Sequence, residues 1–258
     1  MTRAITTLFA SALIGITALF GSGLTQLQAQ AQTASAPADQ AAIEKIVRDY
    51  LLKNPEILAE MQTALETKQA AEHEIRVKQV IANNQDELLN SSHDAVLGNP
   101  DGDVTVVEFF DYNCGYCKRA MPDMEAIIKS DPNVRFVMKE FPILGPDSIK
   151  AHMAAQAFKL MMPEKYRDLH MALMTTPDRS TDESVIAEAV KLGADEAALR
   201  EKINSPEVTS SFQNAYKLAN ELDINGTPSY VIGNELIPGA IGADGLKEKI
   251  AEARAQKK

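Results

Sequence analysis

The feature that most constrains the fold is an apolar strand that leads directly into a pair of cysteines. The stretch VTVVEFF (104–110) is continuous, apolar and rich in β-branched residues, which is typical of a strand buried on both faces. Cys114 and Cys117 follow shortly after it, and residues 116 to about 130 have a helical pattern. The cysteine pair is therefore expected where a buried strand ends and a helix begins.

That position favours a reactive thiolate at Cys114. Free backbone N–H groups and the helix dipole stabilise an anion at a helix N-terminus. A thiolate placed there has a lowered pKa and is both a nucleophile and a good leaving group. Cys117, one turn inside the helix, is expected to be less exposed and suited to resolving a mixed disulfide. The sequence predicts a redox-active Cys114–Cys117 disulfide and no other cofactor.

Two other uses of the cysteines fit less well. A structural bridge across a two-residue loop would constrain the unfolded chain very little. A zinc site needs about four ligands, and the chain holds only two cysteines. The remaining candidates are four histidines, none of them near the cysteines in sequence: His73, His93, His152 and His170. We therefore expect no metal at this site.

The first residues indicate export from the cytoplasm. Arg3 precedes an apolar run (4–24), and LQAQAQ offers small-residue cleavage sites. The run approaches the length of a membrane anchor, but its glycines and the A-x-A-like end favour cleavage. We expect a signal peptide at 1–31, a disordered leader at 32–38, and a soluble mature protein. The formal net charge of −10 argues against nucleic acid and anionic lipid as partners.

The next segment, 39–91, has helical patterns but no core of its own. Asp39 is placed to cap a helix that ends near Asn54, and Asn54–Pro55 starts another. The apolar stripe of the first helix follows helical spacing and consists of Ile43, Ile46, Val47, Tyr50 and Leu51. Such short helices need a partner surface. They can pack on the following domain or self-associate, and we expect self-association.

From residue 94 strands and helices alternate. AVLG (95–98) is expected to be an edge strand, and VRFVMKEF (134–141) the strand after the cysteine helix. Residues 147–222 are mostly helical in pattern. A hairpin with Gly233–Asn234 at its turn and a last helix from about Ala243 complete the chain. This order predicts an α/β fold with an inserted helical lobe.

These motifs together resemble a known superfamily. A strand, a C-x-x-C motif opening a helix and GTP before a late strand are similar to the thioredoxin superfamily, and EFFDYNCGYC…KEFPILGPDS resembles its DsbA-like branch. The resemblance implies a thioredoxin-like catalytic domain at 92–256 with a helical insertion at about 147–222. The N-terminal helices resemble those of ScsC-type proteins, whose trimeric members associate through that region. Segment 39–91 would then be an oligomerisation segment, and the location periplasmic.

The resemblance also implies roles for four residues outside the cysteine motif. Thr227–Pro228 looks like the cis-proline of the family, with the Thr227 backbone pairing with extended substrate. The alternative is an ordinary turn proline. Glu108 corresponds to a buried acid behind the second cysteine, and Lys139 on the next strand could neutralise it. The two would relay the proton when Cys117 attacks, because a buried carboxyl has a raised pKa; otherwise they are a plain ion pair or reach solvent at a strand edge.

The dipeptide Gly115–Tyr116 bears on the direction of the chemistry. DsbA oxidases carry Pro-His there, and a phenol is a weaker, neutral donor, so the oxidising drive is expected to be milder. Gly-Tyr, and Thr before the proline, resemble the isomerases DsbC and DsbG. We therefore expect a periplasmic thiol–disulfide oxidoreductase, acting as isomerase or reductase on unfolded or mis-disulfided exported proteins. A DsbD-like or DsbB-like membrane redox partner would reset it. The alternatives are a monomeric DsbA-like dithiol oxidase, and a holdase chaperone or copper-binding protein.

Two groups of apolar residues have open interpretations. Tyr116, Pro142, Ile143 and Leu144 are candidates for an apolar substrate surface around Cys114, or for ordinary loop packing. Five methionines gather in the helical insertion: Met153, Met161, Met162, Met171 and Met174. Thioethers suit Cu(I), but methionines at helical spacing more commonly fill a core.

Overall fold

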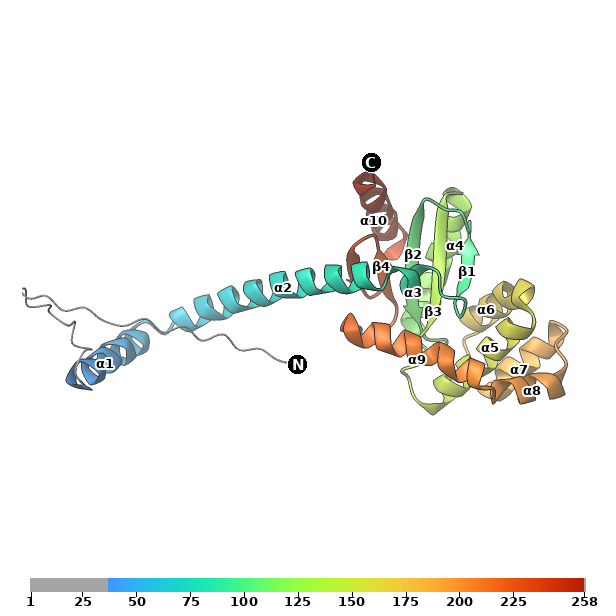
Figure 1. Cartoon of the computed structure of the whole chain (residues 1–258), viewed down its shortest axis with the longest axis horizontal. Helices are drawn as coiled ribbons and strands as arrows, with labels where there is room; N and C mark the ends of the chain where they lie inside the picture. The colour runs from blue at the N-terminus through green and yellow to red at the C-terminus, as the bar shows by residue number, and fades with distance from the viewer. Residues whose placement is uncertain (1–36, 258) are drawn as a thin grey trace, which may run out of the picture. The chain divides into compact units, whose positions relative to one another are not determined.

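The computed structural model describes residues 37–257. The chain divides into two compact units, Met1–Glu60 and Met61–Lys258, and Figure 1 shows their helices and strands. The predicted signal peptide and leader residues 32–36 lie outside the described residues. Among the helices of the described part, none combines the length and the apolar character needed to cross a membrane.

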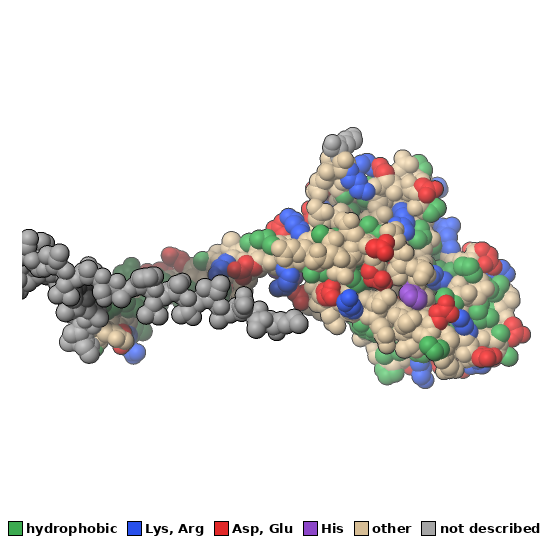
Figure 2. Space-filling view, in the orientation of Figure 1, with side chains coloured by type: hydrophobic (Ala, Val, Ile, Leu, Met, Phe, Trp, Pro, Cys, Tyr) green, Lys and Arg blue, Asp and Glu red, His purple; other side chains and the backbone are tan. Residues whose placement is uncertain are grey.

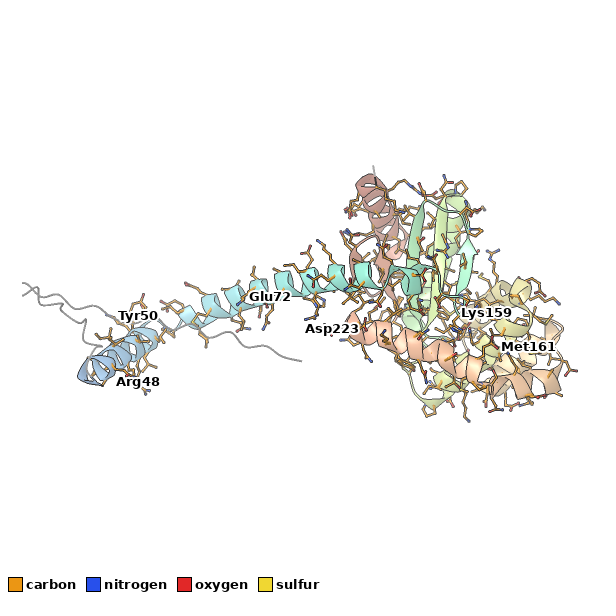
Figure 3. All side chains as sticks on the ribbon, in the orientation of Figure 1. Arg48, Tyr50, Glu72, Lys159, Met161 and Asp223 are labelled. Atoms are coloured by element: carbon orange, nitrogen blue, oxygen red, sulfur yellow. The ribbon has the colours of Figure 1, made fainter. Side chains whose placement is uncertain are left out.

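The first unit contains α1 (Pro37–Lys53). The helix begins two residues before the expected cap at Asp39, with a proline at its first position, where a missing N–H is tolerated. Its predicted apolar stripe is exposed: Ile46 is 67% and Leu51 42% exposed, and the other three members lie between these values. Tyr50 projects from α1 in Figure 3. This surface is unlike the buried face of a helix in a folded core.

Most of α2 (Ile57–Asn83) and all of α3 (Gln85–Leu89) belong to the second unit. Val77, Ile81 and Leu88 are buried in a core that includes residues of the sheet. An ion pair between Arg76 and Asp223 also holds α2. The structure therefore divides the chain near residue 60 rather than at the expected 91, because the later part of α2 has a core to pack on.

The second unit is built on a five-stranded sheet of order β1-β3-β2-β4-β5. Its strands are β1 (Ala95–Gly98), β2 (Val104–Phe110), β3 (Val134–Glu140), β4 (Ser229–Ile232) and β5 (Glu235–Pro238). β2 and β3 are parallel and the other neighbours are antiparallel. The edge position of β1 and the final hairpin are as the sequence predicts. Gly233 in the hairpin turn has φ +59°, which glycine adopts without a Cβ clash.

Helices cover both faces of this sheet (Figure 1). α4 (Gly115–Ser130) and α10 (Gly242–Gln256) pack on the face that carries Val106 and Phe110. α2, α3 and α9 (Pro206–Glu221) pack on the face that carries Val107 and Phe109. Successive β2 side chains therefore alternate between two apolar cores, as period-two geometry requires.

Between β3 and β4 the chain forms a helical lobe. It consists of α5 (Pro146–Met161), a 3₁₀ turn (Pro163–Lys165), α6 (Tyr166–Thr175), α7 (Asp182–Lys191) and α8 (Glu196–Ile203), with α9 following. Met174 is in the core and the other four methionines of the lobe pack against it. That packing fits the interpretation of these methionines as core residues.

Candidate active site

Cys114 is the N-cap residue of α4, between the end of β2 and the first helical turn. The residue is 6% exposed, and its Sγ lies 3.1 Å from the Thr227 carbonyl oxygen, to which it donates when protonated. Cys117 lies one turn later and is fully buried. Both are free thiols. Cys114 is thus the sulfur within reach of solvent, and Cys117 lies behind it.

The Thr227–Pro228 peptide bond is cis, as the resemblance implies. Cys114 and Thr227 are far apart in sequence, and the thiol–carbonyl hydrogen bond brings them together. The start of α4 and the segment before β4 therefore form one site.

The surroundings of Cys114 lower its thiol pKa from 9.0 to about 5. The main cause is a hydrogen bond from the Cys117 thiol, which favours the thiolate of Cys114 against the opposing effect of burial. The Thr227 side chain and the N–H groups of Cys117 and Tyr116 add to this stabilisation. At neutral pH Cys114 is therefore a thiolate.

Two groups behind Cys114, the Cys117 thiol and the Glu108 carboxyl, have raised pKa values. Burial raises the pKa of Cys117 far above its ordinary range, helped by its hydrogen bond to Cys114 and by the charge of Glu108. Burial, and to a lesser degree the negative charge of Cys114, together raise the pKa of Glu108 to about 8. The site thus holds an ionised Cys114 sulfur, a protonated Cys117 thiol and a Glu108 carboxyl that is mostly protonated at pH 7.

The predicted pair of Glu108 and Lys139 is wrong. In the parallel register of β2 and β3, Lys139 lies beside Phe109, so its side chain and that of Glu108 point to opposite faces. The buried Lys139 ammonium pairs with Asp94 and also donates to the Glu87 carbonyl oxygen. Glu108 remains behind the cysteines without this lysine.

Tyr116 of the dipeptide is 62% exposed and has a cationic neighbour. The guanidinium carbon of Arg119 lies 4.3 Å from the centroid of the Tyr116 ring, a cation–π contact at helical i, i+3 spacing. A Cβ at Gly115 would come within 3.4 Å of Arg119 Nη1. The expectation of a neutral dipeptide missed Arg119, which its spacing from Tyr116 could have indicated.

The sequence also gave no role to the buried polar residues that hold the turn before Cys114. Asp111 and His152 are fully buried and hydrogen-bond to this turn. Glu140 and Tyr166 continue the network on the far side of His152. A charged residue directly after a buried strand was the one available signal for Asp111.

The predicted apolar surface is only partly present. Tyr116 is exposed, Leu144 is 42% exposed and Ile143 is half-buried. Pro142 is instead buried, and its carbonyl oxygen accepts from the Tyr216 hydroxyl at 2.5 Å. Ile149, 44% exposed on the next helix, was not expected.

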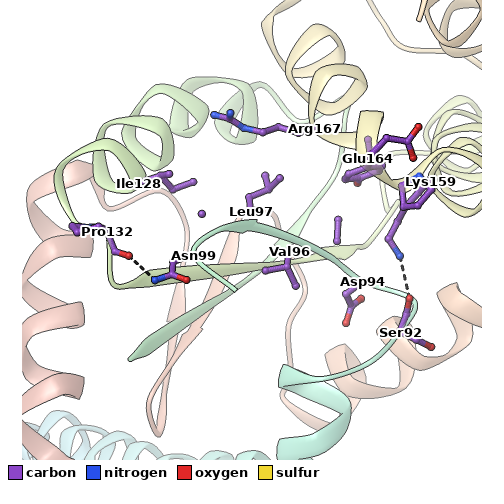
Figure 4. Close-up of a pocket in the computed structure, with 14 residues that line it drawn as sticks. Ser92, Asp94, Val96, Leu97, Asn99, Ile128, Pro132, Lys159, Glu164 and Arg167 are labelled. Carbon is purple, nitrogen blue, oxygen red and sulfur yellow. Dashed lines mark hydrogen bonds between the residues drawn. The ribbon is translucent and has the colours of Figure 1, made fainter. Parts of the chain in front are cut away.

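A cavity in the described residues lies away from the cysteines. It measures about 720 Å³ and runs along β1, bordered by α4, the end of α5 and the start of α6 (Figure 4). None of Cys114, Cys117, Thr227 and Pro228 lines it. The cysteine site therefore lies outside this cavity. On the face seen in Figure 2, acidic and basic side chains are interspersed rather than gathered by sign.

A cysteine at a strand-to-helix turn, a second cysteine buried one helical turn later and a cis-proline bond next to the residue that contacts the first sulfur define a class. With a central mixed sheet and an inserted helical lobe, that class is the thiol–disulfide oxidoreductases of thioredoxin-like fold.

Comparison with known proteins agrees and is more specific. The model of the DSBA-like thioredoxin domain matches residues 105–251, and that of the copper resistance protein ScsC N-terminal domain matches 39–72. The chain belongs to the family of DSBA-like thioredoxin domains, with an N-terminal segment of the ScsC kind. The resemblance seen in the sequence is confirmed, and so is the fold class.

Several relatives support this assignment. A thioredoxin-like oxidoreductase from Silicibacter pomeroyi DSS-3 is 42% identical, with a TM-score of 0.64, covering 67% of this chain and 98% of its own. Proteus mirabilis ScsC in a transitional conformation is 33% identical, with a TM-score of 0.63, covering 86% and 98%. The thiol:disulfide interchange protein DsbA of Bordetella pertussis is 28% identical over 54% of this chain and 68% of its own length.

A further match is partial. The Na(+)/H(+) antiporter NhaA 3 of Salinispora tropica is 23% identical over 65% of this chain. The chain spans only about a quarter (26%) of that protein's length.

Proposed function

We propose that the chain is a periplasmic thiol–disulfide oxidoreductase that acts on the cysteines of exported proteins, chiefly as an isomerase or reductase. The observation that carries this proposal is the pairing of Cys114, the more exposed of the two sulfurs and with a thiol pKa of about 5, and a fully buried, protonated Cys117. The export pattern of residues 1–31 supports the location. No cofactor is proposed beyond the Cys114–Cys117 disulfide.

The reaction begins with the Cys114 thiolate. It attacks a substrate disulfide, forms a mixed disulfide and releases one substrate thiolate. That thiolate attacks another substrate disulfide and frees a different substrate thiolate. This second thiolate attacks the mixed disulfide, so that a new substrate disulfide forms and Cys114 leaves as a thiolate. Alternatively, the Cys117 thiolate attacks the mixed disulfide. The substrate then leaves with two thiols, and the protein holds a Cys114–Cys117 disulfide.

We propose that Glu108 controls when Cys117 attacks the mixed disulfide. While Cys114 is ionised, its charge helps to keep the Glu108 carboxyl protonated. In the mixed disulfide that charge is gone, so the pKa of Glu108 falls and the carboxylate can accept the proton of Cys117. Cys117 then becomes a nucleophile only when a substrate is attached.

Three features support isomerase or reductase activity over oxidase activity. The Cys114 pKa of about 5 lies between about 3.5 for the oxidase DsbA and about 7 for the reductase thioredoxin. Tyr116 supplies no imidazolium between the cysteines. The exposed stripe of α1, in a segment matched by the ScsC N-terminal domain, gives a surface for self-association. We propose a homo-oligomer, a trimer by resemblance, reset by a DsbD-like or DsbB-like membrane protein.

Refolding of scrambled, disulfide-mispaired ribonuclease tests the proposal when combined with light scattering. The mature protein should be oligomeric and should recover ribonuclease activity. A version beginning at Met61, which keeps Val77 and Ile81 in the core, should be monomeric and much less active. Cys114→Ser should abolish the activity without changing the oligomer.

The alternatives give different results in the same experiment. A monomer that only oxidises reduced ribonuclease would be a dithiol oxidase. Protection of unfolded ribonuclease that survives Cys114→Ser would indicate a holdase, and stoichiometric Cu(I) binding by that variant a copper-binding protein.

A further inference from the structure

Asp111 is a fully buried carboxylate in the turn between β2 and α4. Its Oδ1 accepts from the Asn113 N–H at 2.8 Å and from the Ser148 hydroxyl at 2.9 Å. Its Oδ2 accepts from the N–H groups of Ile143 at 2.9 Å and Leu144 at 3.1 Å. One side chain therefore collects hydrogen bonds from three separate segments.

Only a carboxylate suits these four donors. Both of its oxygens are acceptors, whereas an asparagine would turn an NH₂ donor toward some of the same N–H and O–H groups. Burial alone would raise the pKa of Asp111, but the nearby His152 ring and the bonds from Asn113 and Ser148 hold it below its ordinary value. Asp111 is therefore ionised, and its hydrogen bonds are charge-assisted and strong.

The main chain of Asp111 also bonds the turn that carries Cys114, and a change of the Asp111 side chain keeps this bond. The Asp111 carbonyl oxygen accepts from the Cys114 N–H at 2.9 Å. The Tyr112 N–H donates to His152 Nε2 at 3.0 Å, and His152 Nδ1 lies 3.1 Å from the Glu140 carboxylate. The three consecutive N–H groups of residues 112–114 are thus held by Asp111 and His152.

On its other side Asp111 holds the loop 141–145, which leads from β3 to α5. This loop carries the exposed Leu144 and the half-buried Ile143, and it binds Asp111 through the N–H groups of both. Arg179 donates to the Leu144 carbonyl oxygen from outside at 3.1 Å. The buried anchor of the two apolar residues is therefore the Asp111 carboxylate.

We infer that Asp111 is a positioning residue, which fixes the apolar loop 141–145 relative to Cys114 and thereby determines how well a protein substrate docks. The inference rests on the proposed thiol–disulfide exchange and names a determinant of its substrate binding. The Asp111 backbone hydrogen-bonds the Cys117 sulfur, whereas the hydrogen bonds of its side chain hold the loop, so a change of the side chain acts through the loop. Its loss should therefore affect large substrates more than small ones.

Asp111→Asn tests this inference in the full-length mature protein. We expect the KM for scrambled ribonuclease to rise about tenfold, as loss of a charged hydrogen-bond acceptor predicts, while exchange with oxidised glutathione stays within about twofold. The pH titration of the Cys114 thiolate, followed by its ultraviolet absorbance, should match that of the wild type.

Asp94→Asn is the matched control. It removes a half-buried carboxylate that pairs with Lys139 beside the edge strand β1, and should leave KM unchanged. If Asp111→Asn does not fold, Ser148→Ala removes one of the four donors and should raise KM in the same direction by less.

Three results would overturn the inference: an unchanged KM, an equal loss with both substrates, or a shifted Cys114 titration. A wild-type protein that exchanges neither substrate would contradict the proposed function instead.

Discussion

The helices α1 and α4 carry apolar residues at similar spacing, yet they place them differently. In α4, Met121, Met124 and Ile127 are at most 3% exposed, because the sheet and α10 cover them. In α1, Ile46 and Tyr50 are 67% and 60% exposed, and the described part of the first unit provides no such cover. An apolar stripe therefore predicts that a helix will bury one face, but not which surface covers it.

The largest effect is expected where α4 meets its own sheet. Ile127→Ala should destabilise the second unit by about 2–5 kcal/mol, because it leaves a cavity in a fully packed core. Urea unfolding measures the loss. Lys129→Ala, an exposed neighbour on the same helix, should change stability by less than about 0.5 kcal/mol. The oligomeric state should stay the same in both variants. Dissociation of the Ile127→Ala oligomer would mean that α4 also contributes to self-association, against the comparison with α1.

The next effect concerns the acid buried beneath α4. The folded-state pKa of Glu108 is raised from 4.5 to about 8, so its contribution to stability is fully present below pH 4.5 and is lost as pH rises through 8. Glu108→Gln has no such loss. The difference in free energy of unfolding, in favour of Glu108→Gln over the wild type, should therefore grow from pH 5 upward. It should reach on the order of 3 kcal/mol at pH 7, at 1.36 kcal/mol per pKa unit.

Denaturant unfolding of reduced wild type and Glu108→Gln across this range measures the difference. Comparing the two proteins cancels the opposite pH dependence of Cys114, whose lowered pKa adds stability as pH rises above 5. A difference that does not vary with pH would mean that Glu108 is ionised throughout.

The smallest effect per chain is expected on α1. Ile46→Asp should weaken self-association by about 1.5–3 kcal/mol per chain, the value of one buried large apolar side chain. Sedimentation equilibrium would detect the dissociation. Lys45→Ala, which removes an exposed pair with Asp49 on the same helix, is the control and should leave the assembly intact. Equal behaviour of the two variants would exclude the stripe of α1 as the interface.

The sequence predicted the elements around the cysteines well, because each has a local signal. The β-branched run of β2, the alternation into α4 and the Gly233–Asn234 turn depend on residues that are neighbours in sequence. The boundaries of these elements differ from the expected ones by a residue or two, for example a helix start at Gly115 rather than Tyr116. Local patterns therefore predicted correctly that Cys114 lies where β2 ends and α4 begins.

What the sequence could not give depends on register and long-range contact. Lys139 lies one register position from where a pair with Glu108 would need it, and spacing alone does not fix a parallel register. Asp111 bonds to Ser148, 37 residues away, and His152 reaches the same turn from α5. The sequence also did not show that the later part of α2 packs beneath the sheet.

The most direct test of the account is to trap the covalent intermediate. Mature Cys117→Ser protein, mixed with scrambled ribonuclease and quenched with acid, should accumulate a mixed disulfide, and peptide mass spectrometry should locate it on Cys114. Cys114→Ser should trap none, because the remaining Cys117 is buried and protonated. A mixed disulfide on Cys117 in that variant, or none on Cys114 in the first, would contradict the assignment of Cys114 as the nucleophile.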